Sequence, residues 1–150
     1  DGDPRFGGLS RRHRELVNIW VRKEFRNLKR MRKYGLRVPR PITNLKNVLI
    51  MEYLGEGDGV SPRLKDITID EPYEVFEDLL DFLAINWQTA ELVHADFSEY
   101  NILWKDGEPW VIDVGQSVTK QHPHSEEFLV RDVTRLVQWI NEINKVYDKN

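Results

Sequence analysis

The sequence predicts an α+β fold with two lobes, the first of them incomplete. Three long segments repeat their apolar residues with a helical period, and short runs that favour strands lie between them. Residues 55–62 hold three glycines and a proline, which indicates a linker between an earlier and a later part. Helices and small strands in this order are typical of an α+β architecture.

The composition excludes several classes of protein. The 150 residues suit one domain or a piece of a larger one, and 40% hydrophobic residues permit a packed core. There is no cysteine, which excludes disulfides and thiolate zinc sites. No apolar run approaches the roughly 20 residues that span a bilayer, and no signal peptide is visible. We therefore expect a cytoplasmic protein without a membrane partner.

The net charge of −3 conceals a strong asymmetry along the chain. Residues 1–40 carry 13 Lys or Arg against 4 Asp or Glu, whereas residues 41–150 carry 9 against 21. A basic arm on an acidic body indicates an anionic partner such as RNA. A solvated helix face explains the same pattern equally well.

A long helix is predicted in the basic arm. Residues 1–9 read as an extended loop, and Ser10 is predicted to cap a helix that runs to about Tyr34 and ends at Gly35. One face of this helix carries Val17, Val21, Glu24, Leu28 and Met31. A carboxylate in an apolar stripe is costly unless it is paired. Glu24 therefore either reaches water at the edge of the stripe or meets a cation from another element.

Short extended segments follow this helix. Residues 38–41 are predicted to be extended, because a residue that precedes a proline avoids the helical region. Residues 48–54 read as a short strand that follows a turn at residues 44–47. These segments complete the first part of the chain.

The second part is predicted to contain two helices and a hairpin. The helices run from Glu74 to about Ala90 and from Phe128 to Tyr147, and the hairpin runs from Ile102 to Ile112 around Asp106-Gly107. The inward positions are Val75, Leu79, Phe82, Leu83 and Trp87 in the first helix and Leu129, Val133, Leu136, Ile140 and Ile143 in the second.

Two carboxylates and an amide lie at short spacings between these helices. Asp96 and Asn101 are five residues apart in a loop, and Asp113 ends the return strand of the hairpin, so Asn101 and Asp113 can face one metal ion. Mg²⁺ prefers such oxygen ligands, and a nearby carboxylate can orient or deprotonate an acceptor hydroxyl. The pattern predicts phosphoryl transfer from a metal-bound nucleotide. Purely structural roles also stay open, because Asp commonly caps turns and ends strands.

The same residues resemble the protein kinases. His94-Ala95-Asp96 stands where kinases have His-Arg-Asp, and residues 112–115, Ile-Asp-Val-Gly, stand where they have Asp-Phe-Gly. His-Ala-Asp-Phe-Ser-Glu-Tyr-Asn followed by Ile-Asp-Val-Gly-Gln-Ser-Val resembles the RIO family of atypical kinases, and most of all its first subfamily. Segments at 2–6, 23–28, 49–53 and 122–124 agree in their order, so the resemblance covers nearly the whole chain.

The resemblance implies a two-lobed, kinase-like RIO fold. Residues 1–54 would be a partial N-lobe, 55–62 the linker, and 63–150 a mainly helical C-lobe with the catalytic-loop hairpin. The family places its Gly-rich phosphate loop and nucleotide-binding Lys ahead of residue 1. We therefore expect this chain to be a fragment that lacks upstream N-lobe residues. Glu24 would be the helix carboxylate that pairs with the missing Lys.

The resemblance also implies roles for the site residues. Asp96 would be the catalytic base, and Asn101 and Asp113 would bind Mg²⁺ or Mn²⁺. Asp113 would also accept phosphate as an aspartyl-phosphate, so Asp96 and Asp113 are both expected to be catalytic. His94 is expected to brace the loop backbone. Asp132 either bonds the catalytic loop, as an equivalent Asp does in kinases, or is an ordinary surface residue.

The ATP site is expected to use residues from both lobes. Met51 would lie at the back of the adenine pocket, and the carbonyl of Glu52 and the amide of Leu54 would bond the adenine edge. Tyr100 would help to form the floor of the pocket, and Ile112 is also assigned to the nucleotide site.

The implied function is that of an atypical serine/threonine kinase, a transferase with ATPase activity, in maturation of the small ribosomal subunit. Its partners would be ATP and the protein and rRNA of the pre-ribosomal small subunit. Only about ten residues separate Gly115 from the next helix, predicted near Ser125, which is too short for an activation loop. This favours an ATP-driven switch on a larger assembly over phosphorylation of free peptides.

Two alternative functions stay open. Aminoglycoside and choline kinases share a similar His-x-Asp-x4-Asn and a later Asp, but they usually carry Pro-Gly where this chain has Glu99-Tyr100. Fast phosphorylation of a small alcohol would favour such a small-molecule phosphotransferase. The other alternative is a non-catalytic module that docks on a ribosomal particle through its basic helix. If cellular function survives Asp113→Asn, chemistry is not the task.

We predict that these 150 residues alone bind ATP weakly, because they contain neither the Gly-rich loop nor a partner strand that offers the Lys. Titration calorimetry of the isolated chain with ATP and Mg²⁺ measures this directly. Tight binding would show that the phosphates are held without those parts.

Overall fold

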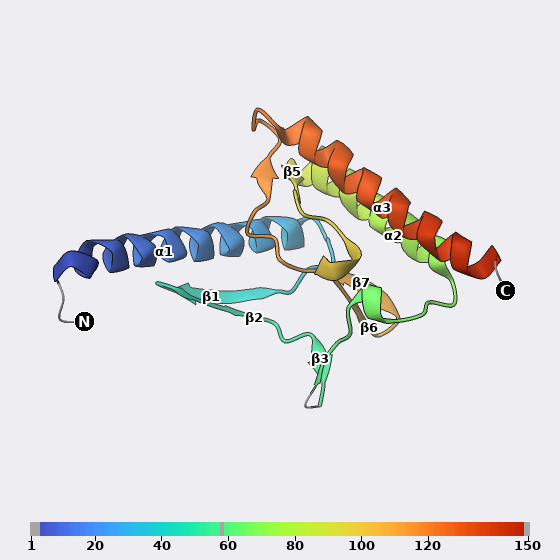
Figure 1. Cartoon of the computed structure of the whole chain (residues 1–150), viewed down its shortest axis with the longest axis horizontal. Coiled ribbons are helices and arrows are strands. Elements are labelled where there is room, and N and C mark those ends of the chain that lie inside the picture. The colour runs from blue at the N-terminus through green and yellow to red at the C-terminus, as the bar shows by residue number, and fades with distance from the viewer. Residues whose placement is uncertain (1–3, 58, 149–150) are drawn as a thin grey trace.

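The structure, a computed structural model, describes residues 4–57 and 59–148. Figure 1 shows a long first helix beside a small hairpin, two further helices that run side by side, and short strands and loops between the two groups. Within the described residues, no helix is long and apolar enough to cross a membrane. The mixed helices and small antiparallel pairs confirm the predicted α+β class.

Helix α1 (Pro4–Lys33) begins earlier than the sequence indicated. The predicted extended loop and the Ser10 cap are wrong from Pro4 onward, and residues 1–3 lie outside the described part. Proline is compatible with a first helical turn, because its missing N–H would have no partner there and its φ is already helical. The helix ends as predicted: Gly35 has a φ of 78°, and Leu36 N–H bonds the Met31 carbonyl at 3.1 Å.

Strands β1 (Pro41–Leu45) and β2 (Val48–Met51) form an antiparallel hairpin beside α1. The sequence predicted one strand over residues 48–54 and missed β1, because a strand that begins with proline and contains Thr-Asn carries little hydrophobic alternation. The predicted linker contains a further small hairpin of β3 (Gly55–Glu56) and β4 (Gly59–Val60).

The second part of the chain follows the predicted order. Helix α2 (Pro72–Ile85) continues into a single π-helical turn (Asn86–Ala90). Helix α3 (Ser125–Asp148) begins at Ser125, as the spacing after Gly115 predicted, and three residues before the Phe128 that the apolar period indicated. Strands β6 (Ile102–Lys105) and β7 (Glu108–Val111) form the predicted hairpin, with Lys105 opposite Glu108. Asp106 and Gly107 both have positive φ, as a type I′ turn requires.

One strand pair in this part was not predicted. Strand β5 (Leu92–Val93) pairs with β8 (Val118–Thr119), and the pair encloses the loop and the hairpin that carry the candidate site. Each of these strands is only two residues long, which is too short to show a periodic pattern. Their partners lie about 25 positions away in the sequence, so local patterns could not reveal this pairing.

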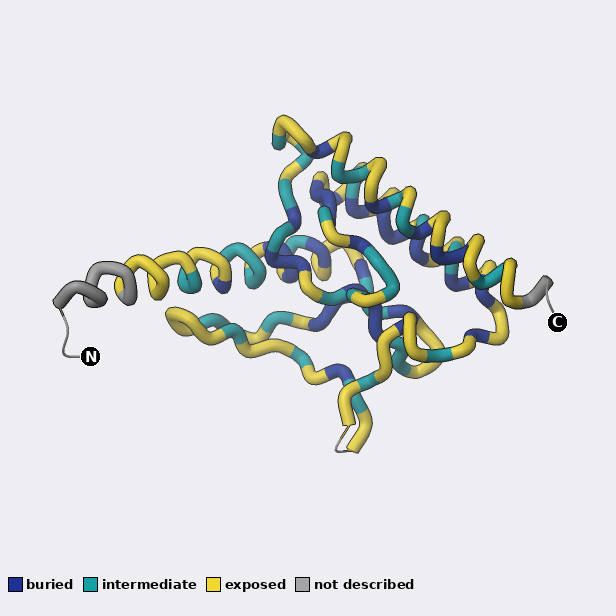
Figure 2. Tube along the Cα trace, in the orientation of Figure 1, coloured by how far each residue is buried: buried dark blue, intermediate teal, exposed yellow. Residues whose placement is uncertain are grey.

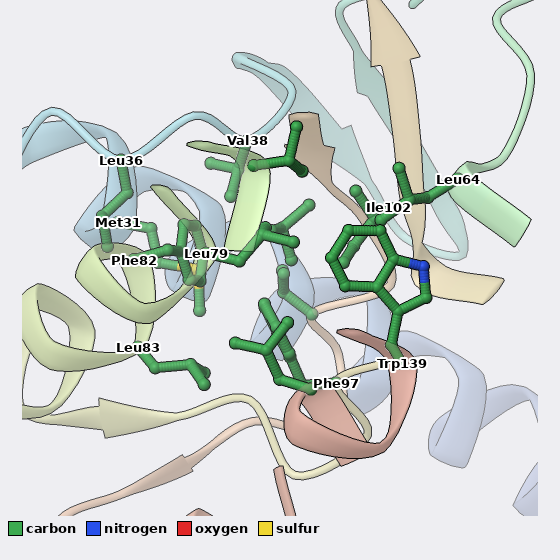
Figure 3. Packing of buried hydrophobic residues seen from close by; sticks show 14 of the residues in the cluster. Met31, Leu36, Val38, Leu64, Leu79, Phe82, Leu83, Phe97, Ile102 and Trp139 are labelled. Atoms are coloured by element: carbon green, nitrogen blue, oxygen red, sulfur yellow. The ribbon is translucent and has the colours of Figure 1, made fainter. Parts of the chain in front are cut away.

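The core lies where the end of α1 meets α2, α3 and the hairpin. Figure 2 shows buried residues concentrated at this junction, whereas residues 11–20 of α1 are exposed or only partly buried. Figure 3 shows how side chains from all these elements meet there. The ring of Phe97, from the candidate catalytic loop, stacks on Phe82 of α2 with their centroids 5.8 Å apart. The loop is therefore anchored in the core by its own side chain.

Replacement of Leu79 by alanine is expected to lower the free energy of unfolding by about 2–5 kcal/mol, because Leu79 is 1% exposed and its removal leaves a cavity. Urea unfolding of both proteins measures the change. The matched control is Leu16→Ala on α1, where the side chain is 59% exposed and the expected change is below about 0.5 kcal/mol. Equal losses in the two variants would contradict the placement of the core.

Candidate active site

Helix α3 holds the loop that carries Asp96. The buried carboxylate of Asp132 accepts the backbone N–H groups of Ala95 and Phe97 at 2.9 and 3.1 Å. The guanidinium of Arg131 donates to the Ala95 carbonyl at 2.9 Å. Ala95 has a φ of 74°, a conformation that costs a non-glycine residue about 1–3 kcal/mol and persists only where surrounding contacts impose it. Of the two roles considered for Asp132, the structure shows the bond to the loop.

His94 braces the same loop from inside, as predicted. It is fully buried, and burial lowers its pKa. The hydrogen bonds define a neutral ring in which Nε2–H donates to the Ile112 carbonyl at 2.9 Å and Nδ1 accepts the Asp96 N–H at 3.1 Å. His94 therefore links the loop of Asp96 to the strand end that leads into Asp113, and it has no free proton-transfer role.

The structure brings Asp96 and Asn101 into contact and places Asp113 just after the strand that pairs with the one following Asn101. The Asn101 amide nitrogen donates to the backbone carbonyl of Asp96 at 2.8 Å and to its Oδ2 at 3.1 Å. Ile112 N–H bonds the Asn101 carbonyl at 2.9 Å, so Asp113 lies one residue beyond this bonded pair, at the open end of the hairpin. Asp113 is exposed and has a φ of 54°. The hairpin thus sets the spacing between Asn101 and Asp113.

These residues fit a magnesium ion that is shared with phosphates. Because the Asn101 nitrogen is used by Asp96, the amide oxygen is the atom left to ligate a metal, beside the carboxylate of Asp113. Mg²⁺ in nucleotide sites typically takes one or two protein oxygens and completes its shell with phosphates and water. In residues 4–57 and 59–148 no cluster of three or more His, Cys, Asp or Glu is placed to hold a metal ion.

A cavity of about 220 Å³ lies between the α1–β2 part and the hairpin. It is lined by the predicted residues Glu24, Met51, Glu52, Leu54, Ile112 and Asp113. Apolar side chains, among them Leu28, Val60 and Leu103, form much of the remaining wall. A mostly apolar cavity with a few polar groups in its wall is typical of a site for a small molecule.

Tyr100 does not line this cavity, and its expected place on the floor is corrected. Its ring is 54% exposed, and the Lys65 ammonium lies 4.9 Å from the ring centroid. Tyr100 instead lines a separate opening of about 690 Å³ that also includes Asp96, Asn101 and Arg135. All three residues of the short 3₁₀ turn Glu99–Asn101 line this second opening, so Tyr100 lies with Asn101 but away from the cavity of Met51.

Glu24 lies half-buried near Asp113. Burial and the Asp113 carboxylate raise the pKa of Glu24, while the Val114 N–H and the Trp20 side chain oppose the shift. Within the described part of the chain, no Lys, Arg or His forms an ion pair with Glu24. The cation that the sequence suggested for this carboxylate is therefore not among the described residues.

Two further α1 residues that the sequence analysis missed hold the Asp113 segment. The buried Asn27 donates to the Val114 carbonyl at 2.9 Å. The Trp20 ring lies against Gly115 so closely that a Cβ there would be 2.6 Å from it, so the approach requires glycine. Asn27 stands three residues after Glu24 and so lies on the same helix face. This spacing is the sequence feature that could have identified Asn27 as part of the site.

A lobe of α-helices, a catalytic-loop hairpin and a cavity against a small hairpin define a protein-kinase-like fold. The RIO domain family matches residues 1–149, and the chain belongs to this family. It is 45% identical over 132 residues to "RIO-type serine/threonine-protein kinase Rio1" of Haloferax volcanii, covering 88% of this chain. It is 41% identical over 140 residues to "Serine/threonine-protein kinase RIO1" of Saccharomyces cerevisiae, covering 89% of this chain.

Solved structures agree with the family. The Rio2 kinase of Chaetomium thermophilum, in a complex described as ADP/Mg²⁺-phosphoaspartate, superposes with a TM-score of 0.71 at 25% identity and covers 85% of this chain and 39% of its own. Another structure of the same kinase gives a TM-score of 0.70. The chain spans 45% of the Haloferax relative and 29% of the yeast relative.

Replacement of Glu24 by glutamine is expected to stabilise the chain at pH 8 but not at pH 4. The folded-state pKa of Glu24 lies above its ordinary value of 4.5, so protonation favours folding, and that contribution is lost as the pH rises through the folded-state pKa. Removal of the charge should then raise the free energy of unfolding by up to about 1 kcal/mol, because partial exposure weakens the effect.

Urea unfolding at the two pH values measures this difference, with Glu15→Gln at an exposed position of the same helix as the control. A Glu24→Gln variant that is less stable at both pH values would show that its carboxylate is stabilised in the fold.

Proposed function

We propose that this chain is part of an atypical serine/threonine kinase or ATPase that transfers the γ-phosphate of ATP in the presence of Mg²⁺. The observation that carries the proposal is the contact between Asp96 and Asn101. The backbone bond between Asn101 and Ile112 ties this pair to the residue that precedes Asp113. Of this group, Asp113 also lines the apolar cavity, so the phosphates of a nucleotide bound there would meet the group at Asp113. Family membership supports the same reaction, because the relatives above are named as kinases.

Each residue has a defined task in this proposal. Asn101 and Asp113 hold the metal, which neutralises charge on the phosphates. The adenine lies against Met51. The amide of Glu52 already bonds Arg40, and the carbonyl of Leu54 already bonds Ser61, so the Glu52 carbonyl and the Leu54 amide are the atoms proposed for the adenine edge.

Asp113 is also the proposed first phosphate acceptor. Its carboxylate oxygen attacks the γ-phosphorus, the bond to the β,γ-bridging oxygen breaks, and ADP leaves. Water then attacks the phosphorus of the aspartyl-phosphate, Asp96 takes its proton, and phosphate is released. Exposure and the left-handed backbone of Asp113 are consistent with an accessible acceptor, and the Chaetomium kinase structure is described as a phosphoaspartate complex.

We further propose action on a large assembly, the pre-ribosomal small subunit in the cytoplasm. Between Gly115 and α3 the chain forms only β8 and a turn, which leaves little surface for a free peptide. Arg26, Lys29 and Lys33 of α1 line an open hollow with Tyr34, and this hollow suits contact with rRNA. Residues 1–54 and 63–150 are proposed as the two lobes, joined at 55–62. Membership of the RIO family disfavours a small-molecule phosphotransferase.

In the intact gene product, Asp96→Ala and Asp113→Asn are each expected to lower ATP turnover at least about a hundredfold, because each removes a group that contacts the reacting atoms. Steady-state release of phosphate with Mg²⁺ measures this, and EDTA should abolish it. Hydroxylamine-sensitive phosphate on the wild-type protein should be absent from Asp113→Asn.

The matched control is Asp106→Asn, in the hairpin turn, where asparagine readily takes the same positive φ. Turnover that survives Asp113→Asn at the control rate would rule out the proposed chemistry, and cellular function that survives this change would favour a docking module.

A further inference from the structure

The carboxylate of Asp96 is held from two sides. Asn101 donates to its Oδ2 at 3.1 Å, and the guanidinium of Arg135 in α3 donates to its Oδ1 at 3.0 Å. Arg135 lies on the wall of the 690 Å³ opening, on which Asp96 and Asn101 also lie, whereas Asp113 lines the other cavity. Asp96 and Asn101 therefore line an opening that is bounded by α3 and is separate from the cavity lined by Asp113.

Arg135 belongs to a set of α3 side chains that act on the same loop. Asp132 and Arg131 fix the peptide groups around Ala95, and Arg135 follows one turn later on the same helix face. The first two contacts hold the backbone of the loop. Arg135 is the member of the set that holds the side chain of Asp96.

The stability of the fold does not explain this contact. The side chains of Arg135 and Asp96 are 42% and 52% exposed, and ion pairs at such positions typically contribute about 0–1 kcal/mol. Geometry explains it better, because a displacement of about 1 Å in a reacting group can cost about a hundredfold in rate. An exposed Asp with only one partner would sample several rotamers.

A second carboxylate shares the opening. The charge of Arg135 lowers the pKa of Glu99, against the larger effect of burial, which raises it. No ion pair joins the two among the described residues, so Asp96 is the carboxylate that Arg135 holds directly.

We propose that Arg135 is a positioning residue that aims Asp96 at the acceptor, and that the acceptor, whether water or a hydroxyl group, reaches Asp96 through the opening on the α3 side. This inference rests on the proposed function. The nucleotide then fills the cavity lined by Asp113, while the acceptor enters by the opening that Asp96 lines.

The test compares Arg135→Ala and Arg135→Lys with wild type in the intact gene product. Arg135→Ala should lower kcat for ATP turnover about tenfold to a hundredfold while KM for ATP stays within about twofold, because the nucleotide cavity is untouched. Its Tm should fall by no more than about 4 °C. Arg135→Lys should recover part of kcat, because lysine keeps the charge but loses the planar fork. Added guanidinium ion should raise kcat of Arg135→Ala but not of wild type.

Lys145→Ala is the matched control, because Lys145 forms an exposed ion pair with Glu142 on the same helix and does not contact the loop. It should keep wild-type kcat. An Arg135→Ala variant with wild-type kcat would overturn the proposed role of Arg135 and leave the proposed function standing. A variant whose defect appears mainly as a raised KM for ATP would do the same. A wild-type protein without turnover overturns the proposed function and this inference with it.

Discussion

The carboxylate of Asp132 lies fully buried beneath the loop of Asp96, where it accepts two backbone N–H groups. Burial raises its pKa, and the two N–H groups oppose the shift. A buried acid is tolerable only when such hydrogen bonds replace water. In return, the bonds hold Ala95 in a backbone conformation that it would not adopt alone. The direction of the Asp96 side chain therefore depends on a residue 36 positions away.

Further hydrogen bonds connect the loop of Asp96 to the rest of the site. His94 connects the loop to the carbonyl of Ile112, and Asn101 connects it to the other side of the same strand end. Asn27 then ties the segment after Asp113 to α1. Each of the three helices thus has a defined part: α3 holds the loop, α2 supports it through the Phe82–Phe97 stack, and α1 holds the segment that follows Asp113. A change in the position of α1 would move Asp113 relative to Asp96.

Sequence patterns predicted those elements whose signals are local. The helical repeats located α2 and α3 within a few residues, and Asp106-Gly107 located the hairpin, because period and turn chemistry are properties of neighbouring residues. The start of α1 was misplaced, since glycines near a proline can be helical in the folded chain. Strands β1, β5 and β8 were missed because they are short and depend on their partners.

For the site, residue types and spacings were enough to single out Asp96, Asn101 and Asp113 and to indicate phosphoryl transfer, because a hairpin of known length brings its two ends together. They could not reveal the contacts of Arg135, Asn27 or Trp20, which join residues 39 to 95 positions apart. Nor could they show that Tyr100 faces a different opening from Met51. Packing of distant segments decides such matters, because the direction of a side chain depends on the element beneath it and the neighbour above it.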